Sequence, residues 1–219
     1  MIDGIWTDKL DIDPQDAVLT AGSCFAQHIS AALDRAGFNW LKSERRPFGL
    51  DDETARAFGY DIFSFRTGNI YTTQMLKQWL QWALEGAVPN DEIWHTDGTI
   101  IDPVRPAIQP DGFDDKGEFD DSRQATLNAI RNGVEEASVF VFTLGLTEMW
   151  FNKETGLCYA SCPGTLGGDF DPDVHGFHDL DHITDPDDTV HANELWGSKV
   201  LDRIAEHIGS EKLSMVQPD

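Results

Sequence analysis

Two short apolar runs, each next to a helical pattern, limit what this chain can fold into. Residues 17–21 are apolar and partly β-branched, which predicts a buried strand, and apolar residues at helical spacing follow over residues 25–36. Residues 138–144 are apolar on both faces, as expected of a central parallel strand, and they directly follow a helical pattern over residues 121–137. Strands that alternate with helices predict an α/β layered fold with a mainly parallel sheet.

Further helices and loops complete this prediction. Two more helices are predicted, one over residues 72–84 and one over residues 193–208, and Gly37 is the expected C-cap of the first helix. Two acidic stretches, residues 111–121 and 167–188, are predicted as loops. The second is long for an unstructured loop in a compact domain, which favours either a functional role or poor order.

The charge of the chain restricts its partners. Its 219 residues fit one domain, and 39 acidic residues against 16 basic ones give a formal charge of −23. A surface this negative repels phosphate backbones and anionic membranes, so we expect neither a nucleic acid nor a membrane as a partner. No apolar run is long enough for a membrane span. Three cysteines in a chain without a recognisable secretory signal predict reduced thiols and a cytoplasmic location.

The sharpest chemical signal is the order strand, then Gly22-Ser23-Cys24, then helix. In open α/β sheets, sites form beyond the carboxyl ends of strands, and the N-terminus of a helix offers free N–H groups and a positive dipole end. A cysteine there is expected to have a lowered pKa and more thiolate, and the same N–H groups could hold an oxyanion. The alternative is a packing or capping feature, in which Ser23 is simply the N-cap of the helix.

A second signal follows the other predicted strand. Residues 143–150 read Thr-Leu-Gly-Leu-Thr-Glu-Met-Trp, and they begin at the same carboxyl edge of the predicted sheet. If the two strands are neighbours, Gly145, Thr147 and Glu148 face the region of Cys24. The alternative is a strand-to-loop turn with a surface glutamate.

Several blocks of residues together resemble those of a known family. The first, Gly22-Ser-Cys-Phe-Ala26, matches the signature from which the GSCFA family takes its name. The other blocks follow in the family's order, at residues 68–72, 102–106, 143–150, 162–164 and 193–201. Blocks in a fixed order are far more specific than any one of them, and the resemblance covers residues 15–205.

The GSCFA family is similar to SGNH-type (GDSL-like) hydrolases, and this similarity implies a fold and a nucleophile. The implied fold is a flavodoxin-like, three-layer α/β/α arrangement. The first block of those enzymes reads Gly-Asp-Ser, with the serine as nucleophile. Aligned residue by residue, Cys24 takes the nucleophile position, and Ser23 is the runner-up.

The resemblance also implies which residues stabilise an oxyanion. Gly68 matches the glycine of the second block better than Gly49 does. Gly145 and Thr147 match the Gly-x-Asn of the third block, so the Thr147 hydroxyl stands where an asparagine amide would donate, and Glu148 stands beside it. A threonine hydroxyl can donate one hydrogen bond but reaches less far than an amide.

The sequence departs from the SGNH pattern at the acid–base block. Those enzymes carry an Asp-x-x-His pair near the C-terminus, whereas Asp179-x-x-His182 falls where the family has a different element, and we interpret it as coincidental. We expect a single domain over residues 1–219, truncated or internally shortened near residues 183–219. Two functions follow: an SGNH-like esterase or acyltransferase acting, without a cofactor, on a small-molecule or carbohydrate ester, or a non-catalytic binding module that lacks the histidine.

Other candidate residues have ordinary alternatives. Arg105 could bind a substrate carboxylate or phosphate, or it could form a buried ion pair with Asp102. Residues 169–173 carry alternate aspartates as a calcium loop does, but a solvated acidic loop without a metal is expected. His28 follows Cys24 by one helical turn and is expected to be a surface or packing histidine. The tryptophans could stack on sugars, although most are expected in the core.

Overall fold

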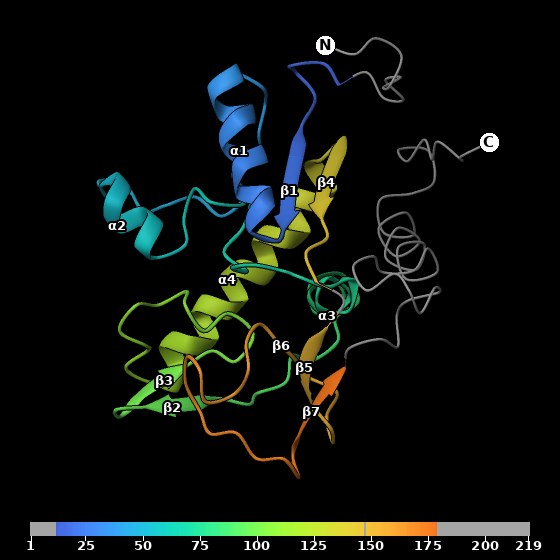
Figure 1. The fold of residues 1–219 in the computed structure, drawn as a ribbon. Helices are drawn as coiled ribbons and strands as arrows, with labels where there is room; N and C mark the ends of the chain where they lie inside the picture. Colours follow the sequence, from blue (N-terminus) through green and yellow to red (C-terminus); the bar gives the residue numbers. More distant parts are fainter. Residues whose placement is uncertain (1–11, 147, 179–219) are drawn as a thin grey trace, which may run out of the picture.

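The computed structural model of the chain describes residues 12–146 and 148–178 (Figure 1). The helix predicted over residues 193–208 and the match Asp179-x-x-His182 lie outside the described residues. No helix in the described part of the chain is long and apolar enough to cross a membrane.

The centre of the structure is a parallel pair of strands, β1 (Val18–Gly22) and β4 (Val139–Thr143). The two strands are paired along their full length, so their carboxyl ends meet at one edge. All residues of β1 are buried, whereas those of β4 are partly buried. On its other side β1 forms a parallel bridge from Val18 to Trp40. Of the two predicted strands it is therefore β1, rather than β4, that is enclosed on both sides by described residues.

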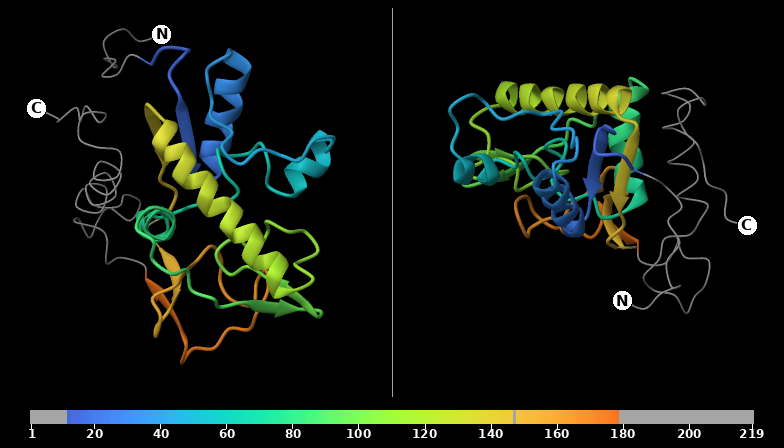
Figure 2. Two further views of the ribbon diagram at one scale, coloured as in Figure 1. Left: turned by 180° about the vertical axis from the view of Figure 1, so that it is seen from behind. Right: turned by 90° about the horizontal axis from the view of Figure 1, so that it is seen from above.

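Helices lie on opposite faces of this strand pair. Figure 2 shows α1 (Cys24–Ala36) on one face and α4 (Lys116–Glu136) on the other. The α4 helix packs closely on β1, because a Cβ atom added to Gly133 would lie 2.7 Å from the Cδ1 atom of Leu19. The α3 helix (Thr73–Leu84) packs against α4.

The helix ends follow local sequence signals, with one difference from the prediction. As predicted, α1 ends at Gly37, which adopts the left-handed conformation with φ of 74°. The α3 helix starts after Thr72, whose Oγ1 accepts a hydrogen bond from the Met75 N–H at 3.2 Å. The α4 helix begins at residue 116, inside the acidic stretch predicted as a loop, because Asp115 accepts a hydrogen bond from the Glu118 N–H and caps a new first turn.

Three short elements between α1 and α4 are absent from the sequence prediction. The α2 helix (Asp52–Ala57) is less than two turns long, and β2 (Trp94–Thr96) and β3 (Thr99–Ile101) form an antiparallel hairpin. The hairpin turn contains Asp97 and Gly98, both with positive φ. Elements this short carry too few residues for a periodic hydrophobic pattern.

A second antiparallel sheet has the strand order β6–β5–β7. It consists of β5 (Met149–Asn152), β6 (Cys158–Tyr159) and β7 (His175–His178). The β7 strand lies inside residues 167–188, so the prediction of a continuous loop there is wrong: pairing with β5 orders this part. The described residues thus combine helices with one parallel pair and two small antiparallel sheets, which is a mixed α/β fold.

Candidate functional site

Strands β1 and β4 approach each other closely at the edge that carries the predicted site. Gly22 has φ of 137°, and a Cβ atom there would lie only 2.5 Å from the carbonyl oxygen of Thr143. The Gly22 carbonyl in turn accepts a hydrogen bond from the Ile70 N–H at 2.8 Å. Glycine is therefore required at this turn, because any side chain would push the two strands apart.

Ser23 occupies the N-cap position of α1, but its side chain does not cap the helix. The residue is only 4% exposed. Its Oγ lies 3.1 Å from the Oγ1 of Thr143 and donates to the carbonyl oxygen of Leu144 at 3.5 Å. Because this hydroxyl bonds to β4, it does not accept from the first turn of α1, where the N–H of Ala26 instead donates to the carbonyl oxygen of Ser23 at 2.9 Å.

Cys24 is the first residue of α1 and its side chain is exposed. The other two thiols differ from it. Cys158 is buried in β6, and burial raises the pKa of its thiol to about 12. Cys162 is half-buried, and its thiol donates to the carbonyl oxygen of Pro163 at 3.4 Å. Of the three cysteines, Cys24 is the one that a reagent or substrate can reach directly.

We expect iodoacetamide at neutral pH to alkylate Cys24 first, Cys162 more slowly and Cys158 last. The reason is that the thiolate is the nucleophile and must be accessible, and the raised pKa of Cys158 leaves it almost wholly protonated. Peptide mass spectrometry over a time course measures the order. Labelling of Cys158 or Cys162 ahead of Cys24 would contradict it.

The segment after β4 lies against this turn, as the sequence predicted for neighbouring strands. The N–H groups of Gly145 and Leu146 both donate to the carbonyl oxygen of Tyr71 at 3.1 Å. A Cβ atom on Gly145 would lie 2.6 Å from the Cβ of Ser23. Thr147 lies outside the described residues. Glu148 is half-buried just before β5.

A pocket of about 320 Å³ opens beside the first turn of α1. Gln27 borders it three residues after Cys24, which is almost one helical turn. Gly68, with φ of 68°, and Arg105 border it from two loops. Its volume is at the lower end of the range of roughly 300–1,000 Å³ for small-molecule sites. Cys24 is not among the residues that line the pocket, which adjoins α1 at Gln27.

Three polar side chains of this pocket were not among the residues predicted from the sequence. The Gln27 amide donates to Asn69 Oδ1 at 3.2 Å, and the Asn69 amide donates to the hydroxyl of Tyr71 at 2.9 Å. This chain of hydrogen bonds connects α1 with the loop before α3. Asn69 and Tyr71 belong to the block at residues 68–72. The sequence analysis used only the glycine of this block, whereas its polar side chains would also have indicated the pocket.

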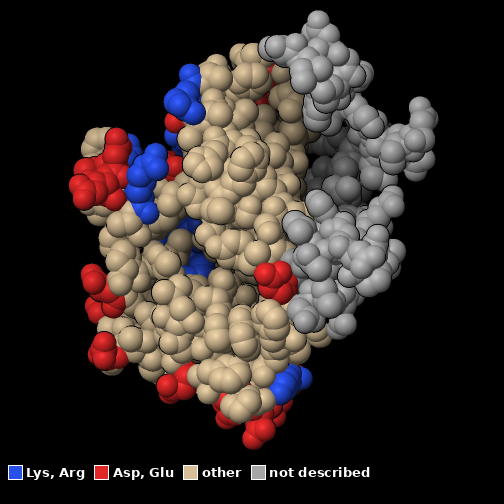
Figure 3. Space-filling model, in the orientation of Figure 1, with Lys and Arg blue, Asp and Glu red and all other residues tan. Residues whose placement is uncertain are grey.

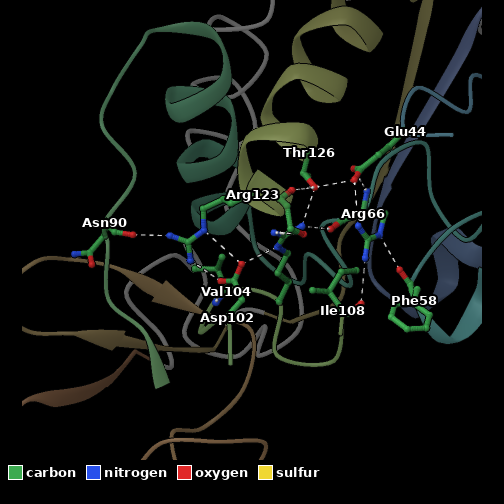
Figure 4. Close-up of polar contacts among 11 residues, drawn as sticks. Glu44, Phe58, Arg66, Asn90, Asp102, Val104, Ile108, Arg123 and Thr126 are labelled. Atoms are coloured by element: carbon green, nitrogen blue, oxygen red, sulfur yellow. Dashed lines mark hydrogen bonds and ion pairs between the residues drawn. The ribbon is translucent and has the colours of Figure 1, made fainter. Parts of the chain in front are cut away.

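Arg105 belongs to a buried ion-pair network with Asp102 and Arg123. Figure 4 shows the side chains of Asp102 and Arg123 pointing toward each other. Its Nε donates to Asp102 Oδ2 at 2.7 Å, and its Nη1 donates to the Thr126 hydroxyl at 2.8 Å. The side chains of Asp102 and Arg105 have no exposed surface. Of the two alternatives for Arg105, the structure has the buried ion pair, and a ligand cannot reach the guanidinium group.

A second pair, Glu44 and Arg66, adjoins this network. Arg66 is anchored by its Nε, which donates to the Phe58 carbonyl oxygen at 2.7 Å, and Glu44 accepts from the hydroxyl of Thr126 at 3.1 Å. The combined network therefore contains three guanidinium groups and two carboxylates, which leaves one positive charge in excess.

The charge of Asp102 is fixed by its two arginine partners. Burial alone would raise the pKa of Asp102, but Arg105 and Arg123 outweigh burial and hold this pKa below its ordinary value. Asp102 is therefore ionised at neutral pH. Because it joins the 102–105 turn to α4, it fixes the floor of the pocket.

No described histidine forms a hydrogen bond with Cys24. His28 is exposed on α1, as expected, and its ring contacts that of Phe25 edge-on. His182 lies outside the described residues. Within the described part of the chain, no group of three or more histidine, cysteine, aspartate or glutamate side chains is arranged to hold a metal ion.

The tryptophans among the described residues are mainly core residues, as expected. Trp79 and Trp94 are buried, and Trp82 packs edge-on against Trp79. Trp150 is partly buried and packs against Phe177 in the small antiparallel sheet.

Together these features define a class of protein: a mixed α/β protein with a candidate nucleophile at a strand–helix turn and a small pocket beside it. The chain belongs to the GSCFA family, whose family model matches residues 17–192. The match spans all the described helices and strands, from β1 to β7. No curated protein and no solved structure is similar enough to the chain to count as a match.

Proposed function

We propose that this chain is an SGNH-like esterase or acyltransferase that acts on a small-molecule or carbohydrate ester with Cys24 as its nucleophile. The observation that carries the proposal is the exposed thiol on the first residue of α1, directly after a buried strand and next to uncapped N–H groups. The runner-up nucleophile, Ser23, is buried and hydrogen-bonded to β4, which favours Cys24.

The proposed reaction begins with attack of the Cys24 thiolate on the carbonyl carbon of the ester. The carbon–oxygen bond to the alcohol then breaks, and the alcohol leaves with a proton. Water in a hydrolase, or an acceptor hydroxyl in a transferase, then attacks the thioester and regenerates the thiol. The N–H of Cys24, with Gly68 and Thr147, is the proposed oxyanion site, and a histidine is the proposed base.

A flavodoxin-like, three-layer arrangement is part of the same proposal. It is supported by a parallel strand pair with α1 and α4 on opposite faces. It is also supported by the position of the candidate nucleophile, which lies beyond the carboxyl end of a parallel strand. The link from the GSCFA family to the SGNH hydrolases remains an inference from the Gly22-Ser23-Cys24 block.

The experiment that tests the proposal is the trapping of an acyl-enzyme. The protein is incubated with p-nitrophenyl acetate, quenched in acid and digested, and the peptides are examined by mass spectrometry. We expect an acetyl thioester on the peptide that contains Cys24, together with release of p-nitrophenol. Acetylation confined to lysines or to another cysteine would rule out the proposed nucleophile.

The alternative function, a non-catalytic module that binds a ligand in the same pocket, predicts a different result. An exposed thiol without catalytic machinery can be acetylated once at most and is not regenerated quickly. Release of more than one equivalent of p-nitrophenol per chain therefore distinguishes the enzyme from the binding module.

A further inference from the structure

The pocket beside α1 has a positive lining in a strongly negative protein. Its described lining residues include Arg56 and Arg105 and contain neither aspartate nor glutamate. In Figure 3 a hollow opens on this face, and basic side chains lie at its bottom. The chain as a whole carries a formal charge of −23, so a pocket without carboxylates contrasts with the rest of the surface.

Arg56 supplies a guanidinium group that a ligand can reach. It is exposed on α2, and no carboxylate of the described residues forms an ion pair with it. Two of the nearby carboxylates have other partners, and a third, Glu53, is exposed on α2. Asp51 accepts from the N–H of Thr54, and Asp52 pairs with Arg46.

The buried ion-pair network also makes the electrostatic potential in the pocket more positive. Arg105 cannot touch a ligand, but it lies under the pocket in a network with one positive charge in excess. At physiological salt, charges beyond about 8–10 Å are largely screened, so the distant acidic surface matters less inside the pocket than these local arginines. Oxyanions are also the natural partners of an unpaired guanidinium group.

We propose that this pocket binds an anionic group, the oxygens of a carboxylate or phosphate, with Arg56 as its direct partner. Gln27 and Asn69 supply neutral amides beside the charged group, where they can bind hydroxyl or carbonyl oxygens. If the proposed esterase or acyltransferase function holds, the substrate is then an ester that carries a negative charge near its acyl carbonyl, such as an acylated acidic sugar. This last step rests on the proposed function, whereas anion binding does not.

The binding test compares acetate with acetamide, which has the same shape and no charge. The full chain, labelled with ¹⁵N, is titrated with each compound and with inorganic phosphate, and the amide signals of Gly59, Gly68 and Asn69 are followed. We expect saturable shifts with acetate or phosphate and none with acetamide, and the stronger of the two anions identifies the type of group. Arg56→Gln is expected to weaken binding about three- to tenfold, whereas Arg35→Gln, at the far end of α1, is expected to leave it unchanged.

Several results would overturn the inference. These are equal shifts with acetamide, wild-type affinity in Arg56→Gln, or no saturable shift with either anion up to about 100 mM, where even one weak charged contact is expected to register.

Turnover of p-nitrophenyl hydrogen succinate against p-nitrophenyl acetate separates this inference from the proposed function. Anion binding without turnover of either ester would contradict the proposed enzymatic function but would still support the anion-binding site. Alternatively, both esters could be turned over equally well, at the same rate in Arg56→Gln and wild type. That result would contradict the proposed charged substrate but would still support the enzymatic function.

Discussion

Replacement of Cys24 by alanine is expected to abolish ester turnover while the protein stays folded. Loss of a catalytic nucleophile typically lowers the rate by at least about 10³-fold, because no other group can form the covalent intermediate. The effect on stability is expected to be small, since the Cys24 side chain is exposed and fills no part of the core. The measurements are kcat/KM on p-nitrophenyl acetate and a denaturant melt of each variant.

Two matched variants make this expectation decisive. Cys162→Ala removes a half-buried thiol outside the proposed site and is expected to leave kcat/KM unchanged. Ser23→Ala removes the hydroxyl that bonds to Thr143 and is expected to reduce activity less than Cys24→Ala does. Full activity in Cys24→Ala with loss only in Ser23→Ala would transfer the nucleophile role to Ser23.

Replacement of Asp102 by asparagine is expected to destabilise the protein by about 3–5 kcal/mol. Removal of one partner from a buried ion pair leaves uncompensated charge, and here both Arg105 and Arg123 would lose their carboxylate. This is a large part of the stability of a typical domain, roughly 5–15 kcal/mol. Chemical denaturation at neutral pH measures it. Asp120→Asn, which breaks the exposed pair with Lys116, is the matched control and is expected to cost less than about 0.5 kcal/mol.

We also expect the difference in stability between wild type and Asp102→Asn to depend on pH. Folding lowers the pKa of Asp102, so its stabilising contribution is complete above its ordinary pKa of about 3.9 and is lost as the pH falls through the lowered value. The stability gap between wild type and Asp102→Asn is therefore expected to be constant above about pH 5 and to narrow in more acidic solution. A gap that widens below pH 4, or an Asp102→Asn variant as stable as wild type at neutral pH, would show that Asp102 does not carry the network's charge balance.

Local sequence determined the turn that carries the candidate site. The apolar run before Gly22 and the helical spacing after Cys24 predict a strand, a turn and a helix, and the structure has them in that order. The end of α1 at Gly37 was also predictable. These features depend on backbone preference and hydrophobic period, which residues close in sequence fix among themselves. The block Gly22–Ala26 at this turn is one of several that resemble the GSCFA family, whose model matches residues 17–192.

The hydrophobic period of the sequence did not reveal the short elements or the start of α4. The β7 strand becomes ordered by pairing with β5, and the hairpin of β2 and β3 is too short to show a period. The first turn of α4 depends on the cap at Asp115, which an acidic, loop-like composition concealed. Pairing partners and caps decide such elements more than propensity does.

The sequence alone supplied the residues Ser23, Cys24 and Arg105, but only the tertiary structure decided what each of them can do. The hydroxyl of Ser23 is occupied because Thr143, distant in sequence, is brought beside it by the pairing of β1 and β4, and this leaves Cys24 as the exposed group. From the sequence, Arg105 could either bind a ligand or form a buried ion pair. The structure shows that it is buried in an ion pair with Asp102 beneath the pocket. Exposure, burial and ion pairing are properties of contacts between distant segments, so they follow from the packed fold and cannot be read from a local pattern.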